Sequence, residues 1–186
     1  MKRIIFLLII LGFPDLGTGA EWTAIFDGKT LNGWKSTSDA NWRVEAGTIV
    51  VDEGMGGLLI HEDTYKNYEL DVEFKAAKAA NSGVFLSTKE KPRNLTTDCY
   101  ELNIAPPDNP FPTGSLVARK KVEGAGETDA WRRFEVRVAD GRVTVKLDGK
   151  EVLDHRARPP AVGIRIGLQK NSGRVAFRNI HVRKLP

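Results

Sequence analysis

Hydrophobic and polar residues alternate along much of the chain with the period of a β-strand. In segment 67–75 every second residue is apolar, namely Tyr68, Leu70, Val72 and Phe74. This period places one set of side chains on a buried face and the other set on an exposed face. Segment 131–139 repeats the pattern. Asp140-Gly141 and Asp148-Gly149 then predict hairpin turns into the apolar positions that begin at Val143 and Val152.

Shorter apolar runs predict further strands, and no segment after residue 20 has the period of an amphipathic helix. The candidates are 42–46, 48–51, 84–86, 99–104, 164–168 and 174–182. Glycine and proline interrupt the chain between them, and the four prolines of 105–113 predict a long loop. Many antiparallel strands at this spacing predict one all-β domain over residues 21–186, folded as a sandwich or a barrel.

The first residues have a different pattern. Lys2 and Arg3 precede an apolar run from residue 4 to residue 13, and small residues follow up to Ala20. A basic start, a short apolar run and a small-residue cleavage site are typical of a secretory signal peptide, and the run is too short to span a bilayer, which takes about 20 residues. We therefore expect residues 1–20 to be a signal peptide of an exported protein, periplasmic or extracellular, with no membrane association after cleavage.

Composition narrows the classes of partner and cofactor. The 28 basic residues exceed the 24 acidic residues by a formal charge of +4, and the two kinds are interleaved, so nucleic acid is not an expected partner. The lone Cys99 excludes an intrachain disulfide and is expected to be a buried free thiol. The three histidines lack metal-ligand spacing and are expected at the surface or in hairpins, and no glycine-rich phosphate loop is present. We expect no metal and no cofactor.

Carboxylates provide two candidate sites. Glu69, Asp71 and Glu73 share one face of a predicted strand, which resembles the Glu-x-Asp-x-Glu strand of β-glucanases, where the first and last acids are nucleophile and acid/base. The alternative is the charged outer face of a half-exposed strand. Glu101 and Asn103 share the face of another predicted strand opposite its apolar residues. Because the neighbour of Glu101 is an amide, this strand alone does not encode a two-carboxylate glycosidase.

A family resemblance extends over residues 21–186. The segment 26–34, Phe-Asp-Gly-Lys-Thr-Leu-Asn-Gly-Trp, resembles the opening signature of the 3-keto-disaccharide hydrolase domain. Other blocks similar to that family follow in order at 42–47, 67–74, 81–85, 100–102, 147–152, 167–169 and 177–180. The resemblance implies an antiparallel two-sheet β-sandwich, the jelly roll of concanavalin A-like lectins and glucanases. It also makes the strand that contains Glu69 and Glu73 a framework element.

The resemblance also implies a chemistry in which one carboxylate suffices. The family acts on sugars oxidised to a ketone at C3, which acidifies the proton at C2. A base can remove that proton, the aglycone leaves from C1, and addition of water completes hydrolysis. Under this resemblance Glu101 is the catalytic base. The amides Asn81, Asn103, Gln169 and Asn171 bind the sugar or orient its keto oxygen.

Several positions depart from the family pattern. Ser87 stands where an arginine is common, Asn103 where a glutamine is usual, and Asn171 where a histidine is typical. Arg119 is a candidate substitute cation opposite the cleft carboxylate. A changed cleft also leaves open a non-catalytic, lectin-like carbohydrate-binding module. For that module the possible sugar-stacking platforms are the four tryptophans, Trp22, Trp34, Trp42 and Trp131, although strand tryptophans are more often core residues.

Overall fold

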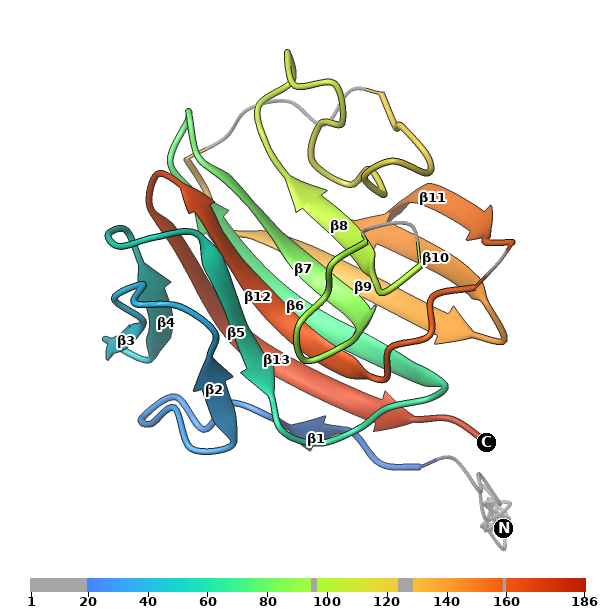
Figure 1. The fold of residues 1–186 in the computed structure, drawn as a ribbon, viewed down its shortest axis with the longest axis horizontal. Coiled ribbons are helices and arrows are strands. Elements are labelled where there is room, and N and C mark those ends of the chain that lie inside the picture. Colours follow the sequence, from blue (N-terminus) through green and yellow to red (C-terminus); the bar gives the residue numbers. More distant parts are fainter. Residues whose placement is uncertain (1–19, 95–96, 124–128, 159) are drawn as a thin grey trace, which may run out of the picture.

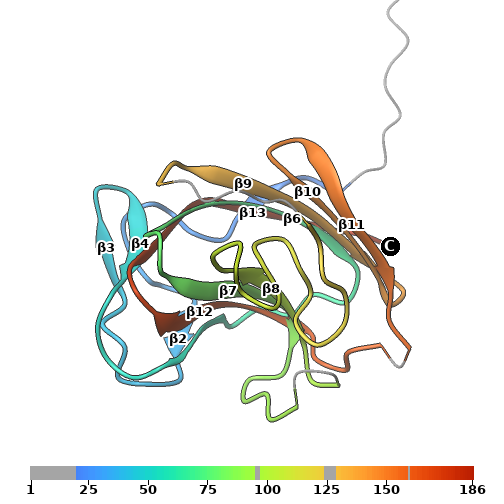
Figure 2. The same cartoon turned by 90° about the horizontal axis from the view of Figure 1, so that it is seen from above.

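The regular structure of the chain consists of β-strands. The computed structural model describes residues 20–94, 97–123, 129–158 and 160–186, and no helix occurs among them. The strands form two antiparallel sheets that stack as the layers of a sandwich (Figures 1 and 2). The prediction of an all-β sandwich is therefore confirmed. Residues 1–19 of the expected signal peptide lie outside the described residues.

The larger sheet has eight strands and forms the rear layer in Figure 1. Its order is β11 (Lys150–Arg156), β10 (Arg142–Leu147), β9 (Arg132–Ala139), β6 (Tyr68–Ala76), β13 (Val175–Lys184), β4 (Thr48–Val51) and β3 (Arg43–Glu45), with β1 (Thr23–Ala24) paired to β13. The strongest alternations in the sequence, 67–75 and 131–139, are β6 and β9 at its centre. Both predicted hairpins, β9–β10 and β10–β11, are present.

The smaller sheet has five strands and lies in front of the larger one in Figure 1. Its order is β2 (Trp34–Ser36), β5 (Gly57–His61), β12 (Arg165–Ser172), β7 (Asn81–Thr88) and β8 (Tyr100–Ile104). The sequence pattern did not predict β5. Its residues Leu58, Leu59 and Ile60 are all buried, so the strand is a continuous apolar run without alternation.

The main core lies between the two sheets. Phe134 of β9 is fully buried and stacks on Phe74 of β6, with ring centroids 4.5 Å apart. A second, smaller apolar cluster consists of Leu58, Ile60, Phe85 and Cys99. Cys99 is a buried free thiol, as predicted, and burial raises its pKa to about 12.

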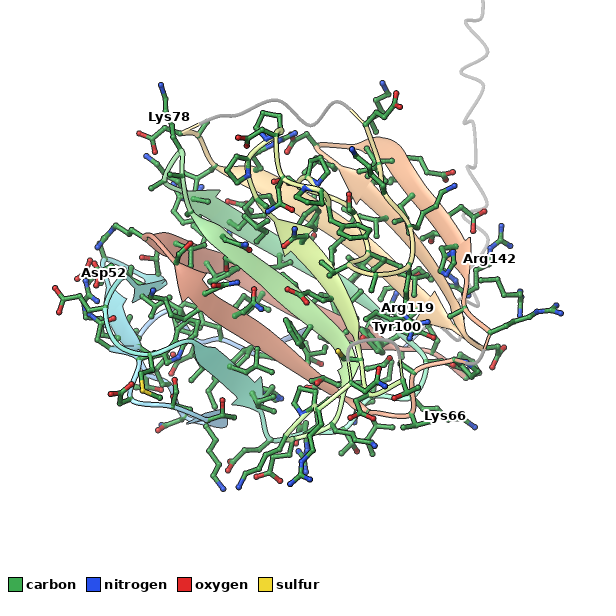
Figure 3. The ribbon with its side chains drawn as sticks, turned by 45° about the horizontal axis from the view of Figure 1, so that its top comes forward. Asp52, Lys66, Lys78, Tyr100, Arg119 and Arg142 are labelled. Carbon is green, nitrogen blue, oxygen red and sulfur yellow. The ribbon has the colours of Figure 1, made fainter. Side chains whose placement is uncertain are left out.

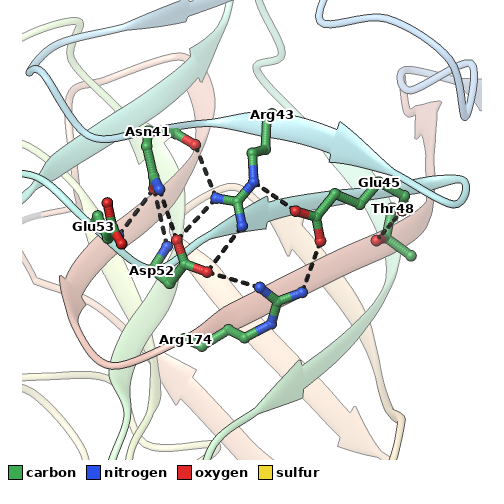
Figure 4. Close-up of polar contacts among 7 residues, drawn as sticks. All are labelled: Asn41, Arg43, Glu45, Thr48, Asp52, Glu53 and Arg174. Carbon is green, nitrogen blue, oxygen red and sulfur yellow. Dashed lines mark hydrogen bonds and ion pairs between the residues drawn. The ribbon is translucent and has the colours of Figure 1, made fainter.

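An ion-pair network links three strands at one corner of the larger sheet (Figure 4). Asp52, after β4, accepts two hydrogen bonds of 2.9 Å from Arg43 of β3 and one of 2.7 Å from Arg174, just before β13. The amide of Asn41 donates to the same carboxylate at 2.7 Å. These contacts tie the β3–β4 hairpin to the start of β13.

This network predicts an acid-sensitive contribution to stability. The hydrogen bonds from Arg43, and then those from Asn41 and Arg174, hold the pKa of Asp52 well below its usual range. A carboxyl whose pKa is lower in the folded state stabilises the fold above its unfolded pKa and loses that contribution as the pH falls. We expect Asp52→Asn to lower the melting temperature by a few degrees at pH 7, and the difference to shrink towards pH 2. Asp108→Asn, at an exposed position of the 105–113 loop, is the matched control, and an equal effect of both changes at pH 7 would contradict the role of the network.

Candidate active site

The predicted catalytic residue lies on the outer face of the five-stranded sheet. The register pairs Phe85 of β7 with Glu101 of β8 on one side and with Gly167 of β12 on the other. Two residues further along these strands, the register pairs Gly83 of β7 with Asn103 of β8 and with Gln169 of β12. Residues two apart on a strand share a face, so β7 and its neighbours gather these side chains on one surface, away from the main core.

Glu101 is a buried carboxylate held by an amide. Its residue is 5% exposed, and the side-chain nitrogen of Gln169 donates to its Oε1 at 3.0 Å. Burial raises the pKa of Glu101, and the hydrogen bond from Gln169 opposes part of that rise. A carboxylate whose pKa is raised towards neutrality is a stronger base than an exposed one, which is a property of catalytic carboxylates.

A glycine allows close packing beside this pair. A Cβ atom at Gly83 would lie 3.0 Å from the carbonyl oxygen of Leu102, 3.5 Å from Oε1 of Gln169 and 3.5 Å from Cγ of Glu101. Among the described residues, Oε1 of Gln169 and Oδ1 of Asn103 are buried side-chain oxygens without a hydrogen-bond partner. Buried polar atoms are normally paired, so two unpaired acceptors on the strands beside Glu101 are an exception that calls for a functional explanation.

A hollow of about 430 Å³ lies on the outer face, with Gln169 of this pair in its wall. Leu58 and Phe85 form an apolar part of its wall, and Gln169 and Asn171 form a polar part. Glu90, Lys91 and Pro92, in the segment that follows β7, form another side. Figure 2 shows this segment projecting from the five-stranded layer away from the other sheet. Gln169 therefore lies between the hollow and Glu101.

The predicted amides do not all have the expected environment. Gln169 and Asn171 lie together at the hollow. Asn103 uses its side-chain nitrogen to bind the carbonyl of Phe111, so half of its amide fastens the proline-rich loop. Asn81 is half-buried at the start of β7, two residues before Gly83 and therefore on the same face by alternation.

Arg119 is turned towards another side chain. Its guanidinium lies over the ring of Tyr100, 4.7 Å from the centroid, and donates to the carbonyl of Cys99 at 3.4 Å (Figure 3). Tyr100 belongs to the core between the sheets, whereas Glu101 is on the outer face of the same strand. The side-chain contact of Glu101 is with Gln169 instead. The suggestion that Arg119 faces the cleft carboxylate is therefore not supported.

Sequence reasoning missed two features of the site. Gly83 precedes the predicted strand 84–86, but it lies inside β7, where a glycine often marks a close approach of another group. Ser87, at the changed arginine position, is buried with a φ of 47°, and its amide donates to the hydroxyl of Tyr68 at 3.1 Å. Its amide is thus used inside the protein.

The β-glucanase alternative is not supported. Glu69 is held by Arg137 and Arg183, and Glu73 by Arg178 and Asn179. Partial burial would raise the pKa of both carboxylates, but these hydrogen bonds and charges lower it. Both acids also belong to β6 in the other sheet from Glu101. A glycosidase acid needs a raised pKa, so neither residue fits that role.

The histidine prediction is wrong for His61. This residue is 7% exposed, packs edge-on against Trp34 at 4.9 Å and lies 2.9 Å from the hydroxyl of Tyr65. Burial lowers its pKa, which agrees with a structural, neutral imidazole.

Over the described residues no group of three or more His, Cys, Asp and Glu side chains is arranged to hold a metal ion. In the same part of the chain, no helix has the length and apolar character needed to cross a bilayer.

The raised pKa of Glu101 predicts how kcat/KM of the reaction it catalyses would depend on pH. If Glu101 acts as a base, only its ionised form is competent, so kcat/KM should rise with pH and reach its plateau above the ordinary range of a glutamate, near 4.3. Gln169→Leu removes the hydrogen bond that lowers this pKa, and the rising limb should then move to higher pH. A limb that stays in place in Gln169→Leu would show that another group controls the rate.

The fold and the site together define a β-sandwich protein with a hollow on the outer face of its five-stranded sheet and a buried carboxylate–amide pair beside that hollow. A family model described as the 3-keto-alpha-glucoside-1,2-lyase-like domain matches residues 21–183, and the chain belongs to this family. A 3-keto-disaccharide hydrolase of Bacteroides thetaiotaomicron is 38% identical over 81 residues. That match spans 37% of this chain and only 28% of the relative's length.

Solved structures support the same fold. A protein of Parabacteroides distasonis, provisionally assigned as a glycosyl hydrolase, superposes with a TM-score of 0.74 at 23% identity, over 89% of this chain and 94% of that one. A family 66 carbohydrate-binding module of Bacillus subtilis superposes with a TM-score of 0.66 at 11% identity, over 82% and 96% of the two chains. At these identities the likeness concerns the fold alone.

Proposed function

We propose that the protein cleaves glycosides whose sugar carries a ketone at C3, with Glu101 as the base. The observation that carries this proposal is the buried Glu101 carboxylate, with its raised pKa and its amide partner Gln169 beside the hollow. The family description, a 3-keto-glucoside 1,2-lyase, and the name of the Bacteroides relative both support it. A single carboxylate is enough because the ketone, and not a second acid, makes the reaction accessible.

The reaction has two steps. Glu101 takes the proton from C2, the electron pair of that C–H bond forms the C1–C2 double bond, and the C1–O bond breaks. The aglycone leaves with the electron pair of that bond and takes a proton from water, and the hydroxide left behind removes the proton from Glu101 and restores the base. Water then adds its hydroxyl to C1 and its hydrogen to C2, which gives net hydrolysis. In the first step negative charge moves onto the C3 oxygen, where hydrogen-bond donors lower the barrier.

The residues of this chain have separate tasks in this scheme. Gln169 orients the Glu101 carboxylate and limits the rise of its pKa. Asn171 and Asn81 contact the sugar nearer the ends of β12 and β7. Gly83 lets Leu102, Gln169 and Glu101 pack closely, because a side chain there would press against them.

The test compares oxidised and unoxidised substrates. The protein is incubated in D₂O with a 3-keto-disaccharide, with the parent disaccharide and with a β-glucan, and the products are followed by NMR. We expect only the oxidised sugar to be cleaved and its product to carry deuterium at C2 at the moment of release, after correction for exchange in buffer. Cleavage of the unoxidised sugars, or a product that retains its C2 proton, would contradict the proposal.

A carbohydrate-binding module without turnover is the second candidate. The hollow and the polar side chains of Gln169 and Asn171 on its wall would bind a sugar equally well without any chemistry. In that case the same NMR experiment shows saturable line broadening of the sugars and no product.

We also propose that the protein is exported, because residues 1–20 have the pattern of a signal peptide. N-terminal sequencing of the protein recovered outside the cytoplasm tests this, with Glu21 as the expected first residue.

A further inference from the structure

Trp22 marks a polar groove on the opposite side of the molecule from Glu101. Of the four tryptophans, Trp34 is buried, and Trp42 and Trp131 are half-buried. Trp22 is 44% exposed. It immediately precedes β1, whose pairing of Thr23 with Val182 brings the indole beside β13. Arg183 lies over the Trp22 ring, 5.0 Å from its centroid, so the position of the ring is fixed by the sheet.

A row of polar side chains continues from Trp22 across the outer face of the eight-stranded sheet. Arg183 pairs with Glu69, Glu69 with Arg137, and Arg137 with Thr144, on four successive strands. Neighbouring strands lie about 4.8 Å apart, so the row is long enough for several linked sugar rings. Glu69 accepts hydrogen bonds of 2.8 Å from both Arg137 and Arg183, which holds the row in one arrangement.

The row borders a hollow of about 350 Å³ that Trp22 and Thr144 both line. This volume falls in the range of small-molecule sites. A row of solvated ion pairs by itself would include neither the hollow nor the exposed indole ring of Trp22. An exposed tryptophan leaves a large apolar face in water, and covering that face by a ligand is favourable.

The charges of the hollow indicate the kind of ligand. Its lining contains four acidic and four basic side chains, so its net charge is zero and it attracts neither anions nor cations. The paired guanidinium and carboxylate groups offer donors and acceptors side by side, as vicinal hydroxyls do. The apolar C–H face of a pyranose fits the ring of Trp22. A neutral, hydroxyl-rich chain satisfies all of these features.

We propose that this groove binds neutral oligosaccharides, as a second carbohydrate site separate from the Glu101 cleft. The two sites lie on different sheets, so one molecule can hold a glycan chain on one side and process a sugar on the other. The proposal does not depend on catalysis by Glu101, and failure of that reaction leaves it intact.

Calorimetric titration of the purified protein with cellohexaose, maltoheptaose and laminarihexaose tests the groove. We expect saturable binding of at least one of them, and an affinity at least tenfold weaker in Trp22→Ala. Thr144→Arg, which fills the hollow without removing the indole, should cause a similar loss and covers the case that Trp22→Ala perturbs β1. Trp131→Ala, a matched change at a tryptophan covered by Arg178, should bind like the original protein.

Glu101→Gln separates this groove from the cleft and should also leave the affinity unchanged. The proposal is overturned if none of the three oligosaccharides binds, or if Trp22→Ala and Thr144→Arg bind as tightly as the original protein. It is equally overturned if the affinity is lost in Glu101→Gln instead, or if hexagalacturonate, an anionic probe, binds more tightly than the neutral sugars.

Discussion

Replacement of Glu101 by glutamine is expected to abolish cleavage of a 3-keto-disaccharide while leaving the fold intact. A positioned general base contributes about 10²–10⁴-fold, and glutamine cannot accept the C2 proton at any accessible pH. We therefore expect kcat to fall by at least about 10²-fold, with product release followed by NMR or chromatography. The loss should be in kcat more than in KM, because glutamine keeps the shape of the side chain and can still bond to Gln169.

The stability of this variant provides an internal check. Because the folded pKa of Glu101 is raised above its unfolded value, the fold loses stability as the pH rises from the unfolded value through the folded value. A neutral glutamine removes this effect, so the melting temperature at pH 7 should be unchanged or slightly higher. Glu69→Gln on the other sheet is the control and should keep its activity. Full activity of Glu101→Gln would show that the base is a different group.

Replacement of Phe134 by alanine is expected to cause the largest loss of stability. Phe134 is fully buried between the sheets and stacked on Phe74 at 4.5 Å. A change from phenylalanine to alanine in a core removes transfer energy and leaves a cavity, at a cost of about 3–5 kcal/mol. This is a large part of the 5–15 kcal/mol that typically stabilises a domain, so we expect the melting temperature to fall by on the order of 10 °C.

Two further substitutions distinguish packing from a general effect of losing an aromatic ring. Phe134→Leu fills most of the space and should cost less than half as much. Phe111→Ala, at a half-buried position in the proline-rich loop, should cost under about 1.5 kcal/mol. Urea unfolding measures all three. An equal cost for Phe134→Ala and Phe111→Ala would contradict the central place of Phe134 in the core.

Local patterns in the sequence were sufficient for most of the larger sheet. β6 and β9 have one buried and one exposed face, so their alternation is visible in the sequence, and the Asp-Gly pairs identify the turns beside them. β5 was missed because both of its faces are covered, one by the main core and one by the cluster around Phe85. A strand without an exposed face has no polar positions to reveal its period.

The candidate site was predictable in composition but not in geometry. The strand pattern identified Glu101 as a candidate, and the family resemblance implied its role as base and added Gln169. The register of β8, β7 and β12 brings the two together although 68 positions separate them. In the same register Gly83 of β7 lies between β8 and β12, and no local sequence pattern indicates this position. The orientation of Arg119 towards Tyr100 depends on how segment 113–120 returns along β8, and a charge count does not reveal such a path.

The return of that segment along β8 has a consequence for the behaviour of the protein in solution. Asn103 exchanges backbone hydrogen bonds with Ser115 and Gly114 at 2.9 Å, and Val117 donates to the carbonyl of Glu101 at 3.0 Å. β8 is the last strand of its sheet, and unpaired edge strands recruit strands from other molecules. Here the backbone groups beside the carboxylate are already bonded within the chain. Extension of this sheet into a dimer or an aggregate would therefore begin at β2, its other edge, well away from Glu101.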